Sequence, residues 1–541
     1  MTSSLRQAVQ GIIDAGRIGT PVAVRVVAHE FAAASSLDTR LAGLLEESCH
    51  WLKTEFEQIA ALGSEESGQM SLLARCRGGQ TVLATTGTFG AGLPLFELSV
   101  VGTRGVIHWR GDANTAARQH ITDEWHFLDD SALKAIRRAL SRTAASTSAG
   151  ASPAASRTAA RQAKQVPAGP MPWGVLLIGG SHTHQENYAA AFAADRRCRL
   201  VGLSDAADIS PRRAALNQRL AQELKIPLLP DLAAALQSDD VHIVSVCAEP
   251  ERRAAIILQA AAAGKHLYLD KPLAASRQEG RDIAAAVQQA GVRSHMFNLA
   301  HSPASLRARR LAESGTLGEL RAVHCDLFFA KGHGGEATLA GPRRESDCPA
   351  NFETIDAKRE FYNVGVYPAV WLRGLLQRPV KQVHATTGNY FFAEHQRQDM
   401  EDFGAALIEY EGGTVATIMA GRTGWRSHPA SGLQRTCLVG SRQVEAVDAF
   451  LPRLEIWADE EPWTAPRRHP DDPMGFWSST QAESGVRPKL GWVLPGPAGP
   501  FDAAYFLDCL EQGRESEASA TAAADVLNLL LDCYASAARP L

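Results

Sequence analysis

A chain of 541 residues is too long for one ordinary hydrophobic core, so we expect roughly two to four domains. With 45% hydrophobic and 21% charged residues the composition is that of a globular protein, and a net charge of −4 provides no bulk attraction for nucleic acid or an anionic membrane. The nine cysteines are scattered and never form CxxC, a pattern typical of reduced thiols. The first residues, MTSSLRQAVQG, do not read as a secretory signal, and no apolar run approaches the roughly 20 residues that span a bilayer. These features predict a cytoplasmic protein without nucleic-acid or membrane partners.

The first 140 residues contain blocks that recur, in the same order, in the last third of the chain. In the first pair of matching blocks a predicted helix is followed by G-x-x-G and a strand. The other two pairs are predicted strands rich in Val, Thr and Gly. The matching blocks are 5–28 with 306–328, 78–87 with 412–421, and 99–109 with 437–447. We therefore predict that residues 1–140 form a shortened second copy of the C-terminal α+β domain. Coincidence is the alternative, because G-x-x-G is a common join between a helix and a strand.

Residues 141–170, SRTAASTSAGASPAASRTAARQAKQVPAGP, contain no acidic and no aromatic residue. Such a segment buries too little apolar surface to offset the entropy of ordering it. The composition predicts a flexible linker over residues 141–171. A partly helical, Ala-rich connector is the alternative.

Short apolar runs then alternate with helix-like stretches up to about residue 300. Strands buried on both faces read as nearly continuous apolar runs, and their alternation with helices indicates parallel βαβ units. The predicted strands are 174–180, 198–205, 241–248, 265–272 and 292–298. Residues 172–300 are therefore predicted to form an α/β domain with a doubly wound parallel sheet.

The pattern from residue 301 to 541 is that of an α+β domain with a mainly antiparallel sheet. FGAALIEYEGGTVATIMAG (403–421) predicts a hairpin that turns at Gly412 and Gly413. Another pair of short strands follows at 436–450, and the last 35 residues are predicted to be helical.

A glycine-containing turn follows the first strand of the predicted parallel sheet. Free backbone N–H groups and the positive end of the next helix would bind a dinucleotide pyrophosphate there. Of the glycines in G-x-G-x-x-G only Gly179 is retained, so a turn that binds nothing is the alternative. The candidate cofactor residues in this turn are Gly179, Gly180, Ser181, His182 and His184.

Asp205 ends the second predicted strand, 26 residues after Gly179. A carboxylate there can accept hydrogen bonds from both ribose hydroxyls and would repel a 2′-phosphate, which favours NAD. Arg212 and Arg213 nearby could still permit NADP. On spacing alone, Asp205 could equally be the N-cap of the following helix.

The segment AAAAGKHLYLDKPLA resembles the Gfo/Idh/MocA (glucose–fructose oxidoreductase and inositol dehydrogenase) family, and the resemblance continues through SGTLGELRAV, FYNVGVYPAVWLRGLL and EDFGAALIEYEGGTVATI. It covers residues 172–541 and implies an NAD(P)-binding Rossmann domain followed by an α/β domain for substrate binding and oligomer contacts. The resemblance puts the family lysine on Lys271, with Asp270 in place of the usual glutamate and Pro272 retained. A lysine cation at the end of a strand can stabilise an alkoxide that develops nearby.

The family's second signature, which usually contains an acid/base histidine, matches Asn363 to Val370. Tyr367 stands in place of the histidine and Asn363 in place of an acid, so Asn363 is expected to bind a polyol hydroxyl without acting as a base. We expect Lys271 to lower the pKa of Tyr367, so that the two residues form a proton-transfer pair. The alternative is that Tyr367 is a core aromatic residue at the start of a helix.

Together these features predict an NAD(P)-dependent oxidoreductase that transfers a hydride between nicotinamide and a sugar, cyclitol or related polyol. An NAD-dependent glycosidase of the same family and a catalytically decayed sugar-binding scaffold are the alternatives. No metal is expected, because the histidines at 182, 184, 301 and 333 lack metal-ligand spacing with a carboxylate. The C-terminal sheet is expected to form a contact with another domain. The contact is either between chains in a homo-oligomer or, within one chain, with the N-terminal copy.

Overall fold

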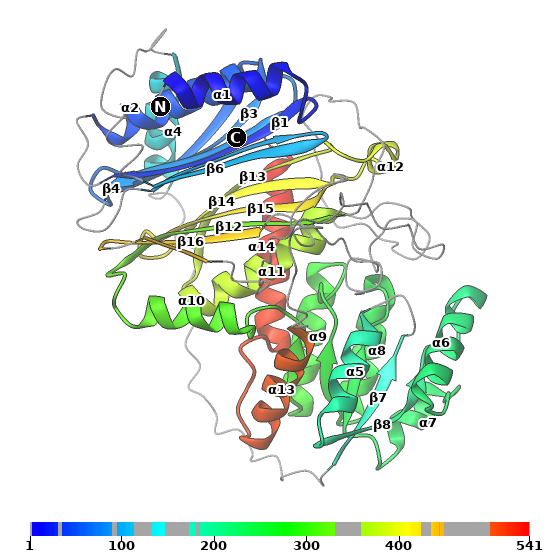
Figure 1. Cartoon of the computed structure of the whole chain (residues 1–541). Helices are drawn as coiled ribbons and strands as arrows, with labels where there is room; N and C mark the ends of the chain where they lie inside the picture. Colours follow the sequence, from blue (N-terminus) through cyan, green and yellow to red (C-terminus); the bar gives the residue numbers. More distant parts are fainter. Residues whose placement is uncertain are drawn as a thin grey trace, which may run out of the picture.

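The computed structural model describes most of the chain. The described residues are 3–30, 35–88, 95–112, 131–146, 172–179, 184–330, 359–423, 434–442, 444–447 and 498–539. Three sheets organise these residues, and they follow one another along the molecule (Figure 1).

The N-terminal domain is a six-stranded sheet with helices on one face. Its strand order is β2-β3-β4-β1-β5-β6, and α2 packs on the sheet beside α4. Its elements are α1 (Ser3–Asp14), β1 (Pro21–Glu30), α2 (Leu37–Leu52), β2 (Phe56–Ser64), β3 (Gln69–Cys76), β4 (Thr81–Thr88), β5 (Leu95–Gly102), β6 (Gly105–Asp112) and α4 (Ser131–Ser146). Helix α4 runs six residues into the segment predicted as a linker, and residues 147–171 lie outside the described residues.

The second sheet has the order β11-β10-β9-β7-β8, and every pair in it is parallel. A single parallel bridge from Leu203 to Leu228 extends its edge beyond β8. The elements are β7 (Trp173–Ile178), α5 (Gln185–Ala194), β8 (Cys198–Ser204), α6 (Pro211–Leu224), α7 (Leu232–Gln237), β9 (Ile243–Val246), α8 (Pro250–Ala262), β10 (His266–Leu269), α9 (Arg277–Ala290) and β11 (Ser294–Met296). The predicted doubly wound domain is confirmed, and its strand order reverses between β7 and β9.

The C-terminal domain has a second six-stranded sheet, of order β13-β14-β15-β12-β16-β17. Its elements are α10 (Pro303–Glu313), β12 (Leu320–Ala330), α11 (Glu360–Leu376), β13 (Val380–Gly388), α12 (Ala393–Arg397), β14 (Phe403–Tyr410), β15 (Val415–Thr423), β16 (Gln434–Gly440), β17 (Val444–Val447), α13 (Ala498–Glu511) and α14 (Ala520–Ala537). Only β12 and β15 pair in parallel, so the expected mainly antiparallel sheet is confirmed. The predicted hairpin forms from β14 and β15, and Gly412 and Gly413 both have positive φ at its turn.

The N-terminal and C-terminal sheets share their topology strand for strand. In each, the first strand pairs in parallel with the fourth and antiparallel with the fifth. A bulge lies near the start of β1 and of β12, and another near the start of β2 and of β13. The G-x-x-G joins also agree, because all four glycines (16, 19, 315 and 318) have φ between 66° and 76°. These agreements support the predicted duplication, which stays our proposal.

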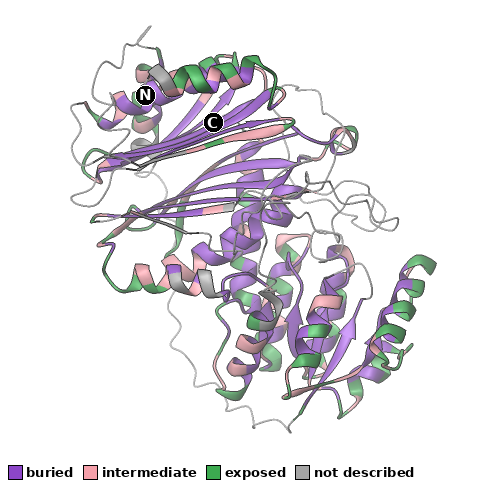
Figure 2. Cartoon of the chain, viewed as in Figure 1, coloured by how far each residue is buried: buried purple, intermediate pink, exposed green. Residues whose placement is uncertain are grey.

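The two sheets lie face to face, and their facing side chains form a shared apolar core (Figures 1 and 2). Leu73 and Leu83 from the N-terminal sheet belong to the same cluster as Phe403 and Leu407 from the C-terminal sheet. Leu72 instead belongs to the N-terminal domain's own core, because successive side chains of a strand point to opposite faces. Strand β3 is therefore buried along its whole length.

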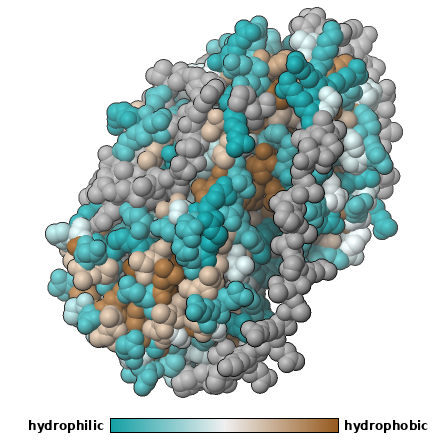
Figure 3. All heavy atoms as spheres, turned by 180° about the vertical axis from the view of Figure 1, so that it is seen from behind, coloured by the Kyte–Doolittle hydropathy of each residue, from teal (hydrophilic) through white to brown (hydrophobic). Residues whose placement is uncertain are grey.

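On the face that Figure 3 shows, most coloured residues are hydrophilic, and apolar residues gather in a few places between them. Among the described residues the large exposed apolar side chains are Leu228, Val380 and Phe501, which belong to separate parts of the fold. No described helix combines the length and the apolar character needed to cross a bilayer.

Candidate functional site

Lys271 lies at the carboxyl end of β10, where the parallel sheet meets α11 of the C-terminal domain. Its Nζ donates a hydrogen bond to the backbone oxygen of Asn363 at 2.8 Å and lies 3.5 Å from the Asn363 Oδ1. The same Nζ is 4.9 Å from the centre of the Tyr367 ring, within range of a cation–π contact. The structure therefore brings together the three residues that the sequence selected for chemistry and substrate binding.

The Asp270 side chain is buried, and its contacts hold the turn that carries Lys271 in place. Its Oδ1 accepts hydrogen bonds at 2.7 Å from the Nδ1 of His184 and from the hydroxyl of Tyr188. Its Oδ2 pairs with Arg253 at 3.1 Å, and the same guanidinium donates to the backbone oxygens of Asp270 and Pro272. Asp270 is thus a positioning residue for Lys271. The sequence analysis missed Tyr188 and Arg253, since neither belongs to a recognisable motif.

Burial decides the pKa values in this site. It lowers the pKa of the Lys271 ammonium to about 7, against the opposing influence of the Asp270 carboxylate. Burial also raises the pKa of the Tyr367 phenol well above its usual value, and Asp270 adds to that shift. The expectation that Lys271 would lower the pKa of Tyr367 is wrong. Lys271, and not Tyr367, is the group that can gain or lose a proton near neutral pH.

Tyr367 lies in the middle of α11 and not at its start, because the helix begins at Glu360. Its ring packs edge-on against Phe297 and Phe329, with centroids 6.2 and 5.8 Å away. The tyrosine therefore closes one side of the Lys271 site as well as contacting the lysine.

Gly179 follows β7 at the point where the strand order reverses, the usual ligand position in an open parallel sheet. It has φ +83°, and a Cβ added there would lie 3.0 Å from the carbonyl of Cys247 after β9. A side chain would thus strain the backbone and press on the neighbouring strand. Gly180, Ser181 and His182 lie outside the described residues. His184 is buried and directed at Asp270, so its imidazole supports the lysine turn.

Asp205 lies just after β8, and its carboxylate is held by three donors. Its Oδ1 accepts from Arg252 and from the backbone of Ala206, and its Oδ2 accepts from Asn217, each at 2.9 Å. Asp205 is not an N-cap, because Ser210 caps the following helix. The arginine beside this carboxylate is Arg252.

Arg213 is one of the two arginines that lie near Asp205 in the sequence. Arg213 is buried and paired with Glu249 at 2.5 Å. That contact directs its guanidinium toward Glu249, so the predicted contribution of Arg213 to NADP selection loses its basis. The arginine that pairs with Asp205 is Arg252, which the sequence did not single out.

The described residues at these strand ends fit a dinucleotide. The glycine with positive φ, the acid and the buried lysine follow the carboxyl ends of β7, β8 and β10, which lie at one edge of the parallel sheet. The Asn363 side chain is 1% exposed, and its Nδ2 has no hydrogen-bond partner among the described residues. An unpaired buried donor costs free energy, so an oxygen atom of a ligand would be favoured beside it.

Two parts of the chain match known protein families. Residues 173–298 match the Gfo/Idh/MocA oxidoreductase family, described as an NAD-binding Rossmann fold. Residues 305–444 match the C-terminal domain of the same family.

The chain is also similar to curated dehydrogenases. Levoglucosan dehydrogenase of Pseudarthrobacter phenanthrenivorans is 32% identical over 209 residues, which are 36% of this chain and 52% of that protein. A 1-carboxy-3-chloro-3,4-dihydroxycyclohexa-1,5-diene dehydrogenase of Comamonas testosteroni is 30% identical over 230 residues, which are 42% and 52% of the two chains. The chain thus spans about half the length of these two relatives.

Solved structures share the fold. The scyllo-inositol dehydrogenase of Lactobacillus casei, solved with NAD(H) and scyllo-inositol, superposes with a TM-score of 0.50 at 13% identity, covering 67% of this chain and 96% of that one. The myo-inositol 2-dehydrogenase of Lactobacillus plantarum gives a TM-score of 0.51 at 14% identity, covering 68% and 97%.

Proposed function

Because the chain belongs to the Gfo/Idh/MocA oxidoreductase family over residues 173–298 and 305–444, we propose that it is an NAD-dependent dehydrogenase. Its substrate would be a sugar, cyclitol or related polyol. The observation that carries the proposal is the buried Lys271 at the end of β10, 2.8 Å from the Asn363 backbone oxygen and with a pKa of about 7. A base whose pKa lies near the operating pH is best suited to accept a proton from a hydroxyl group.

When bound, NAD supplies the hydride acceptor or donor at its nicotinamide ring. In the oxidising direction the neutral amine of Lys271 accepts the hydroxyl proton while the substrate carbon loses its hydride. In the reducing direction the Lys271 ammonium returns a proton to the carbonyl oxygen. The electron pair thus moves with the hydride and the proton with the lysine, so charge balances in both directions.

Asn363 and Tyr367 orient the substrate around that lysine. The unpaired Nδ2 of Asn363 can donate to a second hydroxyl of a polyol, as the sequence predicted for this residue. Tyr367 contributes its ring face to the ammonium and, given its raised pKa, a protonated hydroxyl that can donate but not act as a base. Polyols fit such a pocket, since they offer several oxygens to neighbouring donors.

The relatives support this substrate class. Their names specify levoglucosan, D-xylose and a dihydroxylated cyclohexadiene carboxylate, all of which carry hydroxyl groups on ring or chain carbons. We propose NAD over NADP, because the Asp205 carboxylate would repel a 2′-phosphate. Arg252 offsets part of that repulsion, so the discrimination is expected to be moderate.

The test is a titration of the cofactor-stripped protein with NADH and with NADPH, followed by nicotinamide fluorescence. We expect micromolar binding of NADH and weaker binding of NADPH. Gly179→Ala should weaken NADH binding by roughly tenfold, because a Cβ at this φ, 3.0 Å from the Cys247 carbonyl, would displace the turn at which the dinucleotide is proposed to bind. The matched control is Gly264→Ala, since Gly264 also has positive φ but a Cβ there meets no atom within 4 Å.

Levoglucosan, D-xylose and inositols with NAD⁺ would then be screened for NADH formation. If the folded protein bound neither dinucleotide, the dehydrogenase proposal would be wrong and the scaffold interpretation would replace it. Binding without turnover on any hydroxylated substrate would overturn the proposed substrate class alone.

A further inference from the structure

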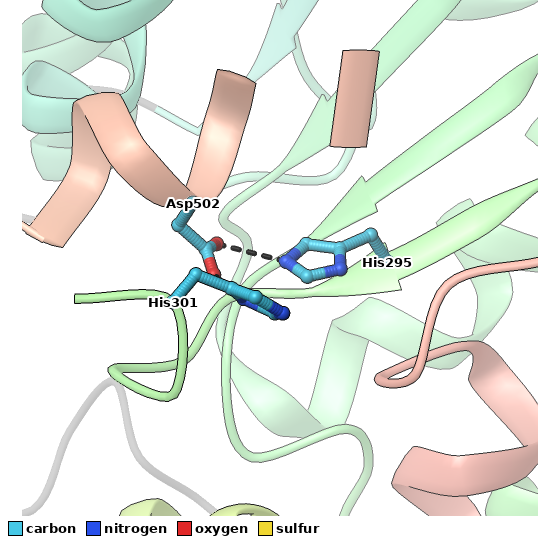
Figure 4. Close-up of side chains that lie close together, drawn as sticks. All are labelled: His295, His301 and Asp502. Carbon is cyan, nitrogen blue, oxygen red and sulfur yellow. Dashed lines mark hydrogen bonds and ion pairs between the residues drawn. The ribbon is translucent and has the colours of Figure 1, made fainter. Parts of the chain in front are cut away.

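Two histidines and an aspartate from distant parts of the chain converge beside the parallel sheet (Figure 4). His295 comes from β11, His301 from the turn before α10, and Asp502 from α13. His295 Nε2 lies 2.9 Å from Asp502 Oδ2, and His301 Nδ1 lies 3.2 Å from Asp502 Oδ1. All three side chains are at most 5% exposed. The cluster is separate from the hydrogen bonds that hold Lys271.

The ligand atoms of the three residues lie within 4.8 Å of one another. A tetrahedral Zn²⁺ has ligand bonds of about 2.0–2.2 Å, which places neighbouring ligand atoms about 3.3 Å apart. The two imidazole nitrogens lie 2.9 and 3.2 Å from different oxygens of the Asp502 carboxylate, so the side chains must rearrange slightly to bring one oxygen and both nitrogens around the same ion. Two imidazoles and one carboxylate form a ligand set that suits zinc and chemically similar divalent metals.

Outer hydrogen bonds orient two of these ligands. The other ring nitrogen of His295, Nδ1, lies 2.6 Å from the hydroxyl of Ser516, and the Tyr268 hydroxyl donates to Asp502 Oδ2 at 2.7 Å. Metal-binding histidines usually donate their second N–H to an oxygen in this way. Such contacts orient the imidazole so that Nε2 faces the space shared with Asp502.

The third ligand is more adaptable. His301 stacks on the ring of Tyr505 with centroids 3.6 Å apart, and its Nε2 is a buried nitrogen with no hydrogen-bond partner among the described residues. The ring can therefore present either nitrogen to Asp502 without breaking another hydrogen bond.

We propose that His295, His301 and Asp502 bind a divalent metal ion of the zinc class, with its fourth position taken by water. The ion would tie α13 to β11 and, through Tyr268, to the strand that carries Lys271. Its role is structural, and it is independent of the proposed dehydrogenase activity. The expectation of no metal considered His301 but not Asp502, which lies 201 residues further along the chain.

The experiment uses the full chain, stripped with a chelator, re-equilibrated with Zn²⁺ and desalted before elemental analysis. Binding of Co²⁺ is followed in parallel by its visible d–d absorption, which reports a four-coordinate site. We expect one ion per wild-type chain and a higher thermal unfolding midpoint with Zn²⁺ present. His301→Gln and Asp502→Asn should weaken binding by more than the roughly 10–100-fold that loss of an outer partner costs.

The matched control is His50→Gln, which removes an exposed histidine on α2 and should retain the ion. If Asp502→Asn does not fold, His301→Gln decides the result, since His301 is the most exposed of the three residues and its Nδ1 pairs with Asp502. The proposal is wrong if wild-type protein retains no more Zn²⁺ than the folded His301→Gln variant, or if the Co²⁺ spectrum is unchanged by that substitution. The three residues would then form a hydrogen-bonded cluster only.

Discussion

The two six-stranded sheets have one topology but different surroundings. Each has its helices on one face and the other sheet on its opposite face, where Leu73 and Leu83 meet Phe403 and Leu407. Only the C-terminal sheet also reaches the parallel domain, through α11 and α14. The six-stranded sheet is therefore a scaffold, and the proposed chemistry depends on the contact of α11 with the parallel domain.

The N-terminal sheet accordingly takes the place that a second subunit could occupy. Its strands β1, β3 and β4 cover apolar residues of β14 and β15 that would otherwise face solvent. Polar contacts add specificity, since Arg435 of β16 donates to Glu97 of β5 at 2.6 Å and Tyr390 donates to the Gly79 backbone at 2.6 Å. We propose that this contact within one chain replaces a dimer contact through the same face.

The largest effect is expected at Lys271, where the parallel domain meets α11 of the C-terminal domain. Lys271→Met removes the only side chain proposed to accept the proton, so kcat should fall by about 10²–10⁴-fold. NADH binding should change little, because the methionine keeps most of the side-chain volume. Lys265→Met is the matched control, because Lys265 lies at the opposite, amino end of β10 and donates to the Ser238 backbone oxygen. Steady-state kinetics of both variants decide, and equal kcat values would exclude Lys271 as the base.

A second, smaller effect is expected where the two sheets meet. Arg25 of β1 pairs with Asp326 of β12 at 3.4 Å and donates to Thr417 of β15 at 3.0 Å. Arg25→Met leaves the Asp326 carboxylate buried without its partner, which should reduce the free energy of unfolding by about 3–5 kcal/mol at pH 8. Denaturant unfolding monitored by circular dichroism measures this change, and kcat should be unaffected.

The loss of stability in Arg25→Met is expected to depend on pH. Burial raises the pKa of Asp326, while Arg25 opposes that shift, with smaller influences from Glu97 and Arg435. Without Arg25 the pKa rises further, and the stability supplied by the protonated form is lost as pH rises through that value. The defect should therefore be smaller at pH 5 than at pH 8, and Arg25→Met combined with Asp326→Asn should recover stability at pH 8. A defect that is the same at both pH values would contradict the pairing.

Local patterns predicted most of the framework. The strands of the parallel sheet were placed within a few residues, because buried parallel strands are continuous apolar runs. The hairpin at Gly412 and Gly413 was found because its turn depends on two adjacent residues. The last six residues of α4 fall in the segment predicted as a linker, since an Ala-rich segment is compatible with both a helix and a linker.

The site was predicted less completely, because its properties depend on burial and on distant partners. The sequence selected Lys271, Asn363 and Tyr367, and the structure brings them together. It could not predict that Tyr367 would have a raised pKa, since burial is set by the packed domains. Nor could spacing reveal that His184 contacts Asp270, which lies 86 residues away.

The smallest effect tests the electrostatics of the lysine turn. Oxidation should accelerate as pH rises through about 7, because the Lys271 amine must be neutral to accept a proton. The Asp270 carboxylate raises the pKa of Lys271, so Asp270→Asn should move the midpoint of the kcat profile to lower pH by about one unit. Tyr188→Phe is the control, since it removes a hydrogen bond to Asp270 but keeps the charge. If both variants kept the wild-type midpoint, a group other than Lys271 would control the profile; a shift in Asp270→Asn alone would identify Lys271 as the titrating group.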